Sequence, residues 1–397
     1  MTRYWYSLVL IVFTVFSIGA YYVYAVGDRP PEFILQKQSG DEREALAVRL
    51  QGTYYNQWVT IDSQGSEYMN ERPYFAQLVH PFYDSPEIAR LIREHRSFMR
   101  GKARFPEVYF ENDRLVAYAY QKQMSANISG YNRFTIAKLD KKSSATFSYD
   151  ADLPHKENYN GVYVQDVQAI GDMLKVATLN YTITGKQEYH LYSFGLKEAK
   201  APSDQLLMSF TNDGNTRHSQ IQIAVNDKTG PSRYLVYGFA QFESGDGRMS
   251  EQADGTELRI FDMETGAEVQ PDAAAIANLL AGDAKPGLFP GISGIQLDGA
   301  NLYLTAQNSQ GIRLIRYGLD DATVSYLDIP VTGAQDTRIG NARLYMLLRS
   351  AETDMPAVAV ADLRTGEILY RGEIAPRKPG EIVPERLLPS LAAIAQR

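Results

Sequence analysis

The sequence predicts an all-β protein, built as a ring of about five to seven four-stranded antiparallel sheets. One N-terminal transmembrane helix and one short amphipathic helix are expected to precede the ring. Three observations support this class: strand–turn–strand units recur along the chain, an uncharged apolar stretch opens it, and tyrosine is abundant. The 27 tyrosines against 2 tryptophans favour strands, because such rings suit pleated, half-buried surfaces.

Length, charge and cysteine content exclude several classes of protein. At 397 residues the chain exceeds what one core usually holds unless it repeats. A net charge of −7 and an isoelectric point near 5.4 argue against a nucleic-acid partner, which needs a basic surface. The absence of cysteine excludes disulfides, thiolate metal sites and cysteine nucleophiles. An exported protein without disulfides is unremarkable in bacteria, so a bacterial source is expected.

Residues 1–26 are predicted to form a membrane anchor. No charged residue occurs from Tyr4 to Val26, and a spanning helix needs roughly 20 apolar residues. Aromatic residues such as Tyr4 and Trp5 lie near the ends of this run, and Arg3 favours a cytoplasmic N-terminus with the remainder extracytoplasmic. The alternative is a cleaved signal peptide ending at Ala25, but the apolar run exceeds the usual signal-peptide core.

Residues 27–50 are predicted to be a stalk, because Gly27–Pro31 stops the first helix and charged residues follow. Ser85, Pro86 and Glu87 then predict the start of an amphipathic helix that ends at Gly101. One side of this helix is basic, which suits contact with anionic lipid or wall polymer. A solvated helix face is the simpler interpretation. The basic residues are Arg90, Arg93, Arg96, Arg100, Lys102 and Arg104.

Five strand–turn–strand units follow Glu107. The clearest runs from Ile292 to Ile329, where Asp298-Gly299 separates two alternating apolar runs, the strongest local signal for a hairpin. Such units predict the blades of a β-propeller occupying residues 51–375, with the segment before Glu107 completing the ring. A twisted multi-sheet sandwich is the alternative. The tail, residues 376–397, is expected to pack a short apolar turn on the ring.

Two turns carry a resemblance to known repeats. Asp262, Thr265 and Gly266, and likewise Asp362, Thr365 and Gly366, resemble the Asp-x-x-Thr-Gly turn of bacterial quinoprotein-type and YVTN-type propeller repeats. In such turns the Asp caps the backbone and the Gly adopts a positive φ. The tryptophan that often follows Thr-Gly in quinoproteins is missing here. The resemblance therefore implies the fold and no cofactor.

Motifs for catalysis are absent from the sequence: it contains no G-x-S-x-G, H-E-x-x-H, P-loop or dinucleotide-binding motif. The five histidines are scattered and are interpreted as structural: His80, His95, His155, His190 and His218. An acidic, glycine-rich insertion offers oxygen ligands for calcium. Its candidate ligands are Glu243, Asp246, Glu251 and Asp254. Arg248 and Met249 break the EF-hand pattern, so a solvated hairpin is the favoured interpretation and no other cofactor is expected.

Other residues on strands and turns leave their roles open. A pair of carboxylates could catalyse glycoside hydrolysis. The sequence does not show which of Asp166, Asp172 and Asp336 would form such a pair. Tyrosines at alternating strand positions are expected to pack between blades, with a minority lining a ligand funnel. They are Tyr109, Tyr118, Tyr163, Tyr189, Tyr237 and Tyr303.

The sequence thus favours a membrane-anchored, extracytoplasmic binding or scaffold protein rather than an enzyme. It would recognise an envelope component or a partner protein through loops on one face of the ring. One alternative is an envelope sensor that signals through its single transmembrane helix. The other is an exported hydrolase or lyase that acts on glycan or peptide.

Overall fold

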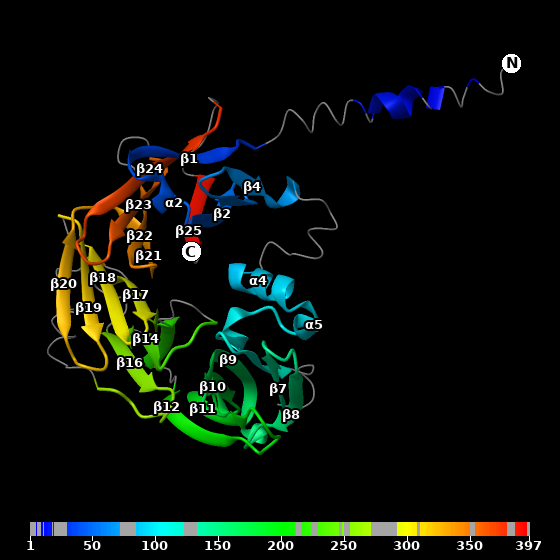
Figure 1. The fold of residues 1–397 in the computed structure, drawn as a ribbon, viewed down its shortest axis with the longest axis vertical. Helices are drawn as coiled ribbons and strands as arrows, with labels where there is room; N and C mark the ends of the chain where they lie inside the picture. Colours follow the sequence, from blue (N-terminus) through cyan, green and yellow to red (C-terminus); the bar gives the residue numbers. More distant parts are fainter. Residues whose placement is uncertain are drawn as a thin grey trace.

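Six antiparallel sheets follow one another along the chain and surround a common centre in the computed structural model (Figure 1). The protein is therefore all-β, as predicted, with short helices between strands. The structure describes residues 5, 9–10, 12–17, 19, 30–71, 85–122, 133–211, 216–223, 229–245, 248–249, 255–270, 292–307, 310–349, 354–378 and 386–394.

Most sheets are four-stranded meanders, numbered here in chain order. Sheet 1 contains β25 (Leu387–Ile394), β2 (Val48–Tyr54), β3 (Gln57–Ile61) and β4 (Ser66–Tyr68). Sheet 2 contains β5 (Tyr109–Glu111), β6 (Leu115–Lys122), β7 (Arg133–Asp140) and β8 (Thr146–Asp152). Sheet 3 contains β9 (Tyr159–Ile170), β10 (Met173–Thr182), β11 (Lys186–Gly195) and β12 (Ser203–Thr211).

Sheet 4 contains β13 (Thr216–Ile223), β14 (Tyr234–Gly245), the short β15 (Arg248–Met249) and β16 (Gly255–Asp262). Sheet 5 contains β17 (Ile292–Asp298), β18 (Asn301–Gln307), β19 (Ile312–Gly318) and β20 (Val324–Ile329). Sheet 6 has five strands: β21 (Ala334–Gly340), β22 (Arg343–Arg349), β23 (Pro356–Asp362), β24 (Ile368–Pro376) and β1 (Phe33–Gly40).

The two ends of the chain each complete a sheet formed by distant residues. β1 lies in the segment predicted as a stalk, 27–50, and pairs with β24 along sheet 6. β25 lies in the predicted tail, 376–397, and pairs with β2 as the first strand of sheet 1. The predicted boundary at residue 50 falls inside β2. Sheet 1 is therefore built from residues near both ends of the chain.

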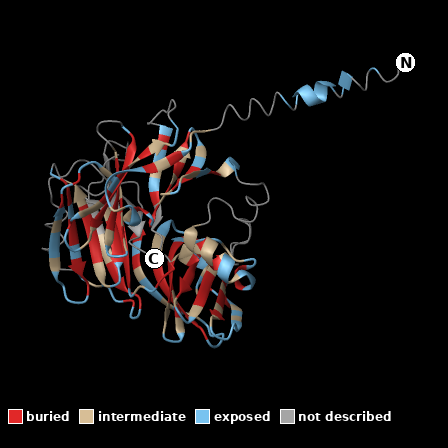
Figure 2. Cartoon of the chain, turned by 45° about the horizontal axis from the view of Figure 1, so that its top comes forward, coloured by how far each residue is buried: buried red, intermediate tan, exposed pale blue. Residues whose placement is uncertain are grey.

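Buried clusters join neighbouring sheets. Apolar side chains of sheets 1 and 6, 2 and 3, 3 and 4, 4 and 5, and 5 and 6 each form one cluster. Figure 2 shows the buried residues following the strands, whereas the turns are largely exposed. Between sheets 1 and 2 the described residues form no such cluster. There α4 (Pro86–Glu94) and α5 (Arg96–Met99) pack on sheet 2.

The repeat extends to individual hydrogen bonds. In five sheets, the N–H just after the third long strand (β7, β11, β16, β19 or β23) donates to a carbonyl in the connection between the first two strands. The pairs are Lys141 to Arg114, Leu196 to Asp172, Met263 to Arg233, Leu319 to Ala300 and Leu363 to Ala342. The same bond in five successive units confirms the recurrence that the sequence predicted.

Polar side chains on the first strands of sheets 5 and 3 tie each of these two sheets to the next one. Gln296 on β17 donates to the carbonyl of Thr337 (2.7 Å) and accepts from the N–H of Ile339 on β21 (2.5 Å). Gln168 on β9 makes the corresponding pair with Gly230 and Ser232. Because these amides satisfy buried backbone groups that have no strand partner, they fix the spacing between sheets.

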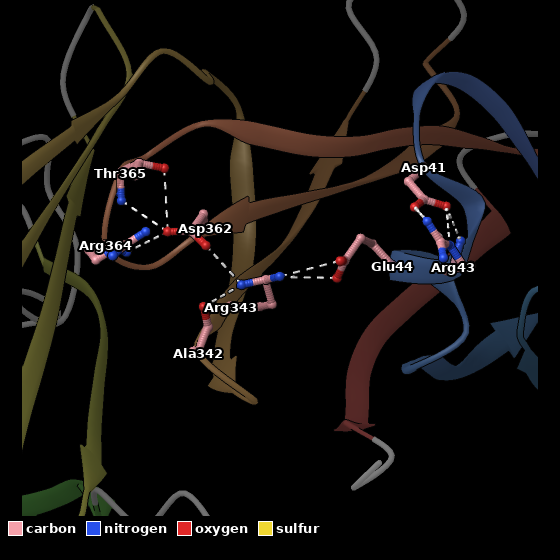
Figure 3. A network of polar contacts seen from close by, with 8 residues as sticks. All are labelled: Asp41, Arg43, Glu44, Ala342, Arg343, Asp362, Arg364 and Thr365. Atoms are coloured by element: carbon pink, nitrogen blue, oxygen red, sulfur yellow. Dashed lines mark hydrogen bonds and ion pairs between the residues drawn. The ribbon is translucent and has the colours of Figure 1, made fainter.

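An ion-pair network fastens the N-terminal segment to sheet 6 (Figure 3). Arg343 at the start of β22 donates to both carboxylate oxygens of Glu44 on α2 (Glu42–Ala45), at 3.2 and 3.3 Å, and to Asp362 at 2.8 Å. The three side chains are 16–25% exposed. Charge-assisted bonds in such partly buried places are among the stronger ones in proteins.

Replacing Arg343 by Met is expected to lower the free energy of unfolding by about 2 kcal/mol, because Glu44 and Asp362 both lose a charged donor. Urea denaturation measures the effect. Arg313→Met is the matched control: Arg313 pairs with Asp328 at the surface, where such pairs contribute less than about 1 kcal/mol. Equal losses in the two variants would show that the network does not fasten the N-terminal segment.

The connections at the two ends of the strands differ in length. Connections between first and second, and between third and fourth, strands are mostly tight turns, the longest being 196–202 and 224–233. We call this side the tight-turn end. Connections between second and third strands, and those between sheets, leave from the opposite side, the long-connection end. They include 69–108, which holds α4 and α5, and 246–254, which holds the short β15, as well as 123–132 and 271–291.

Among the described residues, no helix combines the length and apolar character needed to cross a membrane. Of the predicted span 4–26, Tyr4, Val26 and most residues between them lie outside the described part of the chain.

Candidate functional site

The two Asp-x-x-Thr-Gly turns have the geometry that the sequence predicted. Asp262 Oδ1 accepts from the N–H groups of Glu264 (2.8 Å) and Thr265 (3.1 Å), and Gly266 has φ +70°. Asp362 repeats this with Arg364 (2.9 Å) and Thr365 (3.0 Å). These N–H groups lower the pKa of Asp362. Both aspartates are thus engaged in their own turns and close hairpins at the tight-turn end.

A buried polar cluster surrounds His190 in sheet 3. The His190 Nδ1 atom lies 2.7 Å from an Asp204 oxygen, and Nε2 lies 3.3 Å from both Glu188 Oε2 and the Tyr159 hydroxyl. The imidazole stacks on Tyr192, with ring centroids 5.5 Å apart. Both ring nitrogens already have partners, so the imidazole has no nitrogen left for a metal ion or a substrate. The cluster holds β9, β11 and β12 together.

A second buried group lies between sheets 3 and 4. Asp166 on β9 is 2% exposed, and its carboxylate accepts from the Gln168 amide at 3.1 and 3.3 Å and from the N–H of Val167. Burial raises the pKa of Asp166 to about 7 and that of Tyr237 well above its usual value. The Tyr189 and Tyr237 rings lie 5.1 Å apart. Within the described structure, neither hydroxyl has a hydrogen-bond partner.

A third cluster joins α4 to sheet 2. Glu94, His95 and Glu111 bring three possible metal-ligand atoms within 4.8 Å of one another. Arg90 contacts both carboxylates, and Lys141 donates to Glu111 at 2.6 Å. Burial opposes ionisation of Glu111, yet the bonds from Arg90 and Lys141 outweigh it and lower its pKa. Two cations already neutralise these carboxylates, so the cluster is a salt-bridge network rather than a metal site.

The carboxylates proposed from the sequence do not form a pair. Asp336 on β21 accepts from the N–H of Leu391 at 2.9 Å and so links sheets 6 and 1. Asp172 pairs with Lys197 at the exposed tight-turn end, and Asp166 is buried. Each contacts different partners in a different place. The geometry gives none of them the shared substrate position that glycoside hydrolysis requires.

Most of the predicted calcium ligands and some of the histidines lie in parts of the chain for which the structure describes no side chains. Asp246, Glu251 and Asp254, three of the calcium candidates, lie outside the described residues, and Glu243 lies on β14, where only the backbone is described. His80 is likewise outside this part, and His218 lies on β13. His155 has a positive φ of 54° in a turn. Calcium binding therefore stays a prediction.

The tyrosines separate into two groups. Five of the six predicted to pack between blades are buried: Tyr109, Tyr118, Tyr189, Tyr237 and Tyr303. Tyr163 is 47% exposed and meets Tyr181 edge-to-face at 5.7 Å. The inter-blade packing role is confirmed for Tyr189, Tyr237 and Tyr303. Tyr109 and Tyr118 instead pack against α4 and α5, and Tyr163 faces solvent.

Exposed apolar side chains gather at the long-connection end. Of the large apolar residues exposed in the described chain beyond residue 30, six lie where strands meet this end: Tyr55, Trp58, Tyr163, Tyr181, Ile183 and Leu388. Phe105, in the connection that carries α4 and α5, is also exposed. Leu46, Leu206 and Tyr326 lie elsewhere. Sequence reasoning missed this grouping, because alternation within a strand does not show which strand ends remain uncovered.

Comparisons by sequence and by structure give different results for this chain. No family model matches it, and no curated protein does. Solved structures similar to it include propeller proteins, in keeping with the resemblance of the two turns. A polysaccharide lyase, Uly1, shares 10% identity over 68% of this chain and 57% of its own, with a TM-score of 0.36.

The Dos1 propeller shares 12% identity over 68% of this chain and 56% of its own, with a TM-score of 0.32. A WD40 domain from Toxoplasma gondii coronin shares 13% over 68% and 59%, with a TM-score of 0.29. The chain spans 38–57% of the length of the first three similar structures. At these scores the likeness carries no argument about activity.

Proposed function

We propose that the chain is a six-bladed β-propeller that residues 4–26 hold at the outer side of the cell membrane. In this proposal it is a binding protein that recognises an envelope component or a partner protein at the long-connection end. Six successive sheets, the recurring turn bond and the two terminal strands that complete sheets 1 and 6 support the propeller. The uncharged run from Tyr4 to Val26 supports the anchor.

The grouping of exposed aromatic and aliphatic residues at the long-connection end is the observation that carries the binding function. Rings such as Tyr163 and Tyr181 offer large contact areas with few rotatable bonds, which favours recognition. The opposite end presents tight turns whose polar groups are engaged internally. A rigid ring with its long connections on one side is the arrangement in which loops bind and the scaffold positions them.

A photo-crosslinking residue at position 181 tests the binding face in intact cells. We expect covalent adducts from Tyr181 and none from Tyr326, a matched control that is also exposed but lies on the outer strand β20. Adducts from both positions, or from neither 181 nor 163, would contradict a binding face at this end. Incubation with glycan and peptide libraries accompanies the experiment, since turnover would reassign the protein to the hydrolases or lyases.

The anchor has its own test. Membrane fractions washed with alkaline carbonate are expected to retain the full chain, because an uncleaved apolar helix resists extraction. Mass spectrometry of the retained protein is expected to find the original N-terminus. A mature chain that begins at Val26 would instead identify residues 1–25 as a cleaved signal peptide.

A further inference from the structure

We infer that His190 and Glu188 form a proton-operated switch beside the binding face at the long-connection end. Uptake of one proton by the His190 imidazole fastens the Glu188 side chain inside sheet 3, and loss of that proton releases it toward water. The switch itself depends on contacts within sheet 3. Its consequence for ligand binding rests on the proposed function, which places Tyr181 and Ile183 of the same hairpin on the binding face.

Three oxygen atoms surround the two ring nitrogens of His190. The Nδ1 atom lies 2.7 Å from Asp204 Oδ1, and Nε2 lies 3.3 Å from both Glu188 Oε2 and the Tyr159 hydroxyl. A carboxylate accepts hydrogen bonds and donates none, so each ring nitrogen must carry a proton to bind its own carboxylate. Both carboxylates are therefore satisfied at once when the imidazole is charged.

The neutral imidazole has a single N–H, and the short contact with Asp204 assigns this N–H to Nδ1. Nε2 then becomes an acceptor, to which the Tyr159 hydroxyl donates. Glu188 faces the same lone pair and loses the one hydrogen bond that its side chain makes among the described residues. Its side chain is 22% exposed. A carboxylate that is mostly buried and lacks a donor is costly, so it turns toward water.

Tyr159 has other partners when Nε2 carries a proton. Its hydroxyl is also hydrogen-bonded to Asn180 and Tyr192, and the Asn180 amide donates to the Tyr192 hydroxyl at 2.9 Å. The Tyr159 hydroxyl then donates into this group instead of to His190. Tyr192 stacks on the imidazole and keeps the plane of the ring in both states. The proton thus changes the partner of Glu188 while the ring stays in place.

Two carboxylates are the charged groups that face His190 in the described chain: Asp204 on β12 and Glu188 on β11. β9 contributes one hydroxyl, and the other facing side chains are uncharged. These are Thr178 and Asn180 on β10 and Phe134 on β7. In the connection before β9, Lys156 pairs with Asp152. Histidine is the side chain whose charge changes between about pH 5 and pH 8, so the imidazole is the group that switches.

Glu188 lies close to the proposed binding face. It pairs with Asn180 on β10. Tyr181 follows Asn180, and Ile183 lies in the turn that joins β10 to β11; both are exposed at the long-connection end. Through His190, Glu188 links the start of β11 to β9 and β12, so its release loosens the tip of this hairpin. We therefore expect the binding face to be more ordered at acidic pH, where an ordered face binds at a lower entropic cost.

Nitrogen NMR of the full chain, labelled with ¹⁵N-histidine in detergent micelles, tests the proton directly. Chemical shifts distinguish protonated from unprotonated ring nitrogens, and the loss of signals in His190→Gln identifies those of His190. We expect Nδ1 to be protonated throughout and Nε2 to gain its proton as pH falls from 8 to 5. An Nε2 atom that stays unprotonated, or stays protonated, over this range would overturn the switch.

A spin label follows the hairpin in the same preparation. Because the protein has no cysteine, Lys186→Cys gives a single labelling site at an exposed position where β11 begins. The mobile fraction of the label is expected to rise roughly tenfold from pH 5 to pH 8, the effect of one hydrogen bond to a charged group. Ser325→Cys on β20, also exposed, is the matched control and should show the same mobility at both pH values.

Glu188→Gln separates the switch from other titrating groups. The glutamine amide can donate to a neutral Nε2 and accept from a protonated one, so it stays bound in either state. We expect the label at position 186 to be immobile at both pH values in this variant. His155→Asn removes an exposed imidazole from a turn with φ 54°, a conformation that asparagine tolerates. It is expected to keep the wild-type response.

Equal mobility of the label at pH 5 and pH 8, a wild-type response in Glu188→Gln, or a lost response in His155→Asn would each overturn the inference. Photo-crosslinking from position 181 tests the consequence, and adducts are expected to be more abundant at pH 5. Equal yields at both pH values would overturn the link between the switch and binding. If the label responds to pH but position 181 gives no adduct at either pH, the switch is confirmed and the proposed binding function is wrong.

Discussion

Replacing Asp166 by Asn is expected to remove a pH dependence of stability. Burial raises the pKa of Asp166 to about 7 from a usual 3.8, so the folded protein keeps a proton there that the unfolded chain has released. The wild type therefore loses stability as pH rises from about 4 to about 7. Between pH 5 and pH 8 this amounts to roughly 2–3 kcal/mol. The variant carries no charge at either pH and avoids the loss.

Urea denaturation gives the free energy of unfolding of both proteins at pH 5 and at pH 8. The change between the two pH values is then compared between wild type and variant, so that the contributions of other titrating groups cancel. Asp172→Asn is the control, because Asp172 is exposed and pairs with Lys197 at the surface. It is expected to follow the wild type at both pH values. If Asp166→Asn also follows the wild type, Asp166 is ionised in the folded protein and the interface between sheets 3 and 4 admits water.

Replacing Gly52 by Val is expected to detach the C-terminal strand from sheet 1. A Cβ atom at Gly52 would lie 2.3 Å from the Leu388 carbonyl oxygen and 2.6 Å from Pro389 Cα, both backbone atoms of β25. The clash cannot be relieved by a side-chain rotation. We expect a loss on the order of 3 kcal/mol in the free energy of unfolding, together with rapid proteolysis of the chain after residue 386.

Thr53→Val is the matched control for Gly52→Val. It introduces the same side chain at the next position of β2, where successive side chains point to opposite faces of the strand. The control is expected to keep wild-type stability within about 1 kcal/mol. If Gly52→Val unfolds and is proteolysed in the same way as the wild type, β25 does not pair with β2. In that case the C-terminal strand does not complete sheet 1.

Much of the strand and turn pattern could be read from the sequence, because the interactions that form it are local. Asp262 and Asp362 bind N–H groups two and three residues ahead, so the pattern alone indicates the turn. Alternation from Ile292 to Leu297 likewise identifies a strand with one buried face. The four-strand unit that contains them follows from adjacent hairpins, which need no distant partner.

The structure reveals contacts that no local pattern indicates. His190 meets Asp204 on the neighbouring strand through a register with an irregularity between Tyr189 and His190, and an irregular register cannot be read from spacing. The environment of Asp166 depends on Tyr237, which lies in another sheet. Histidine and aspartate are common on exposed turns as well, so residue type alone did not distinguish these two from surface residues.

The sequence by itself determined the all-β class, the repeating hairpins and the apolar N-terminal run, since each follows from residues close together in the chain. Only the tertiary structure decided that β1 joins β24 and that β25 joins β2, pairings between residues more than 300 positions apart. The residues of a strand indicate that it will form part of a sheet. Which strand it pairs with depends on which sheet edge is unpaired once the ring has folded. The same holds for Glu44 and Arg343, 299 residues apart, whose attraction acts only after the sheets have brought them together.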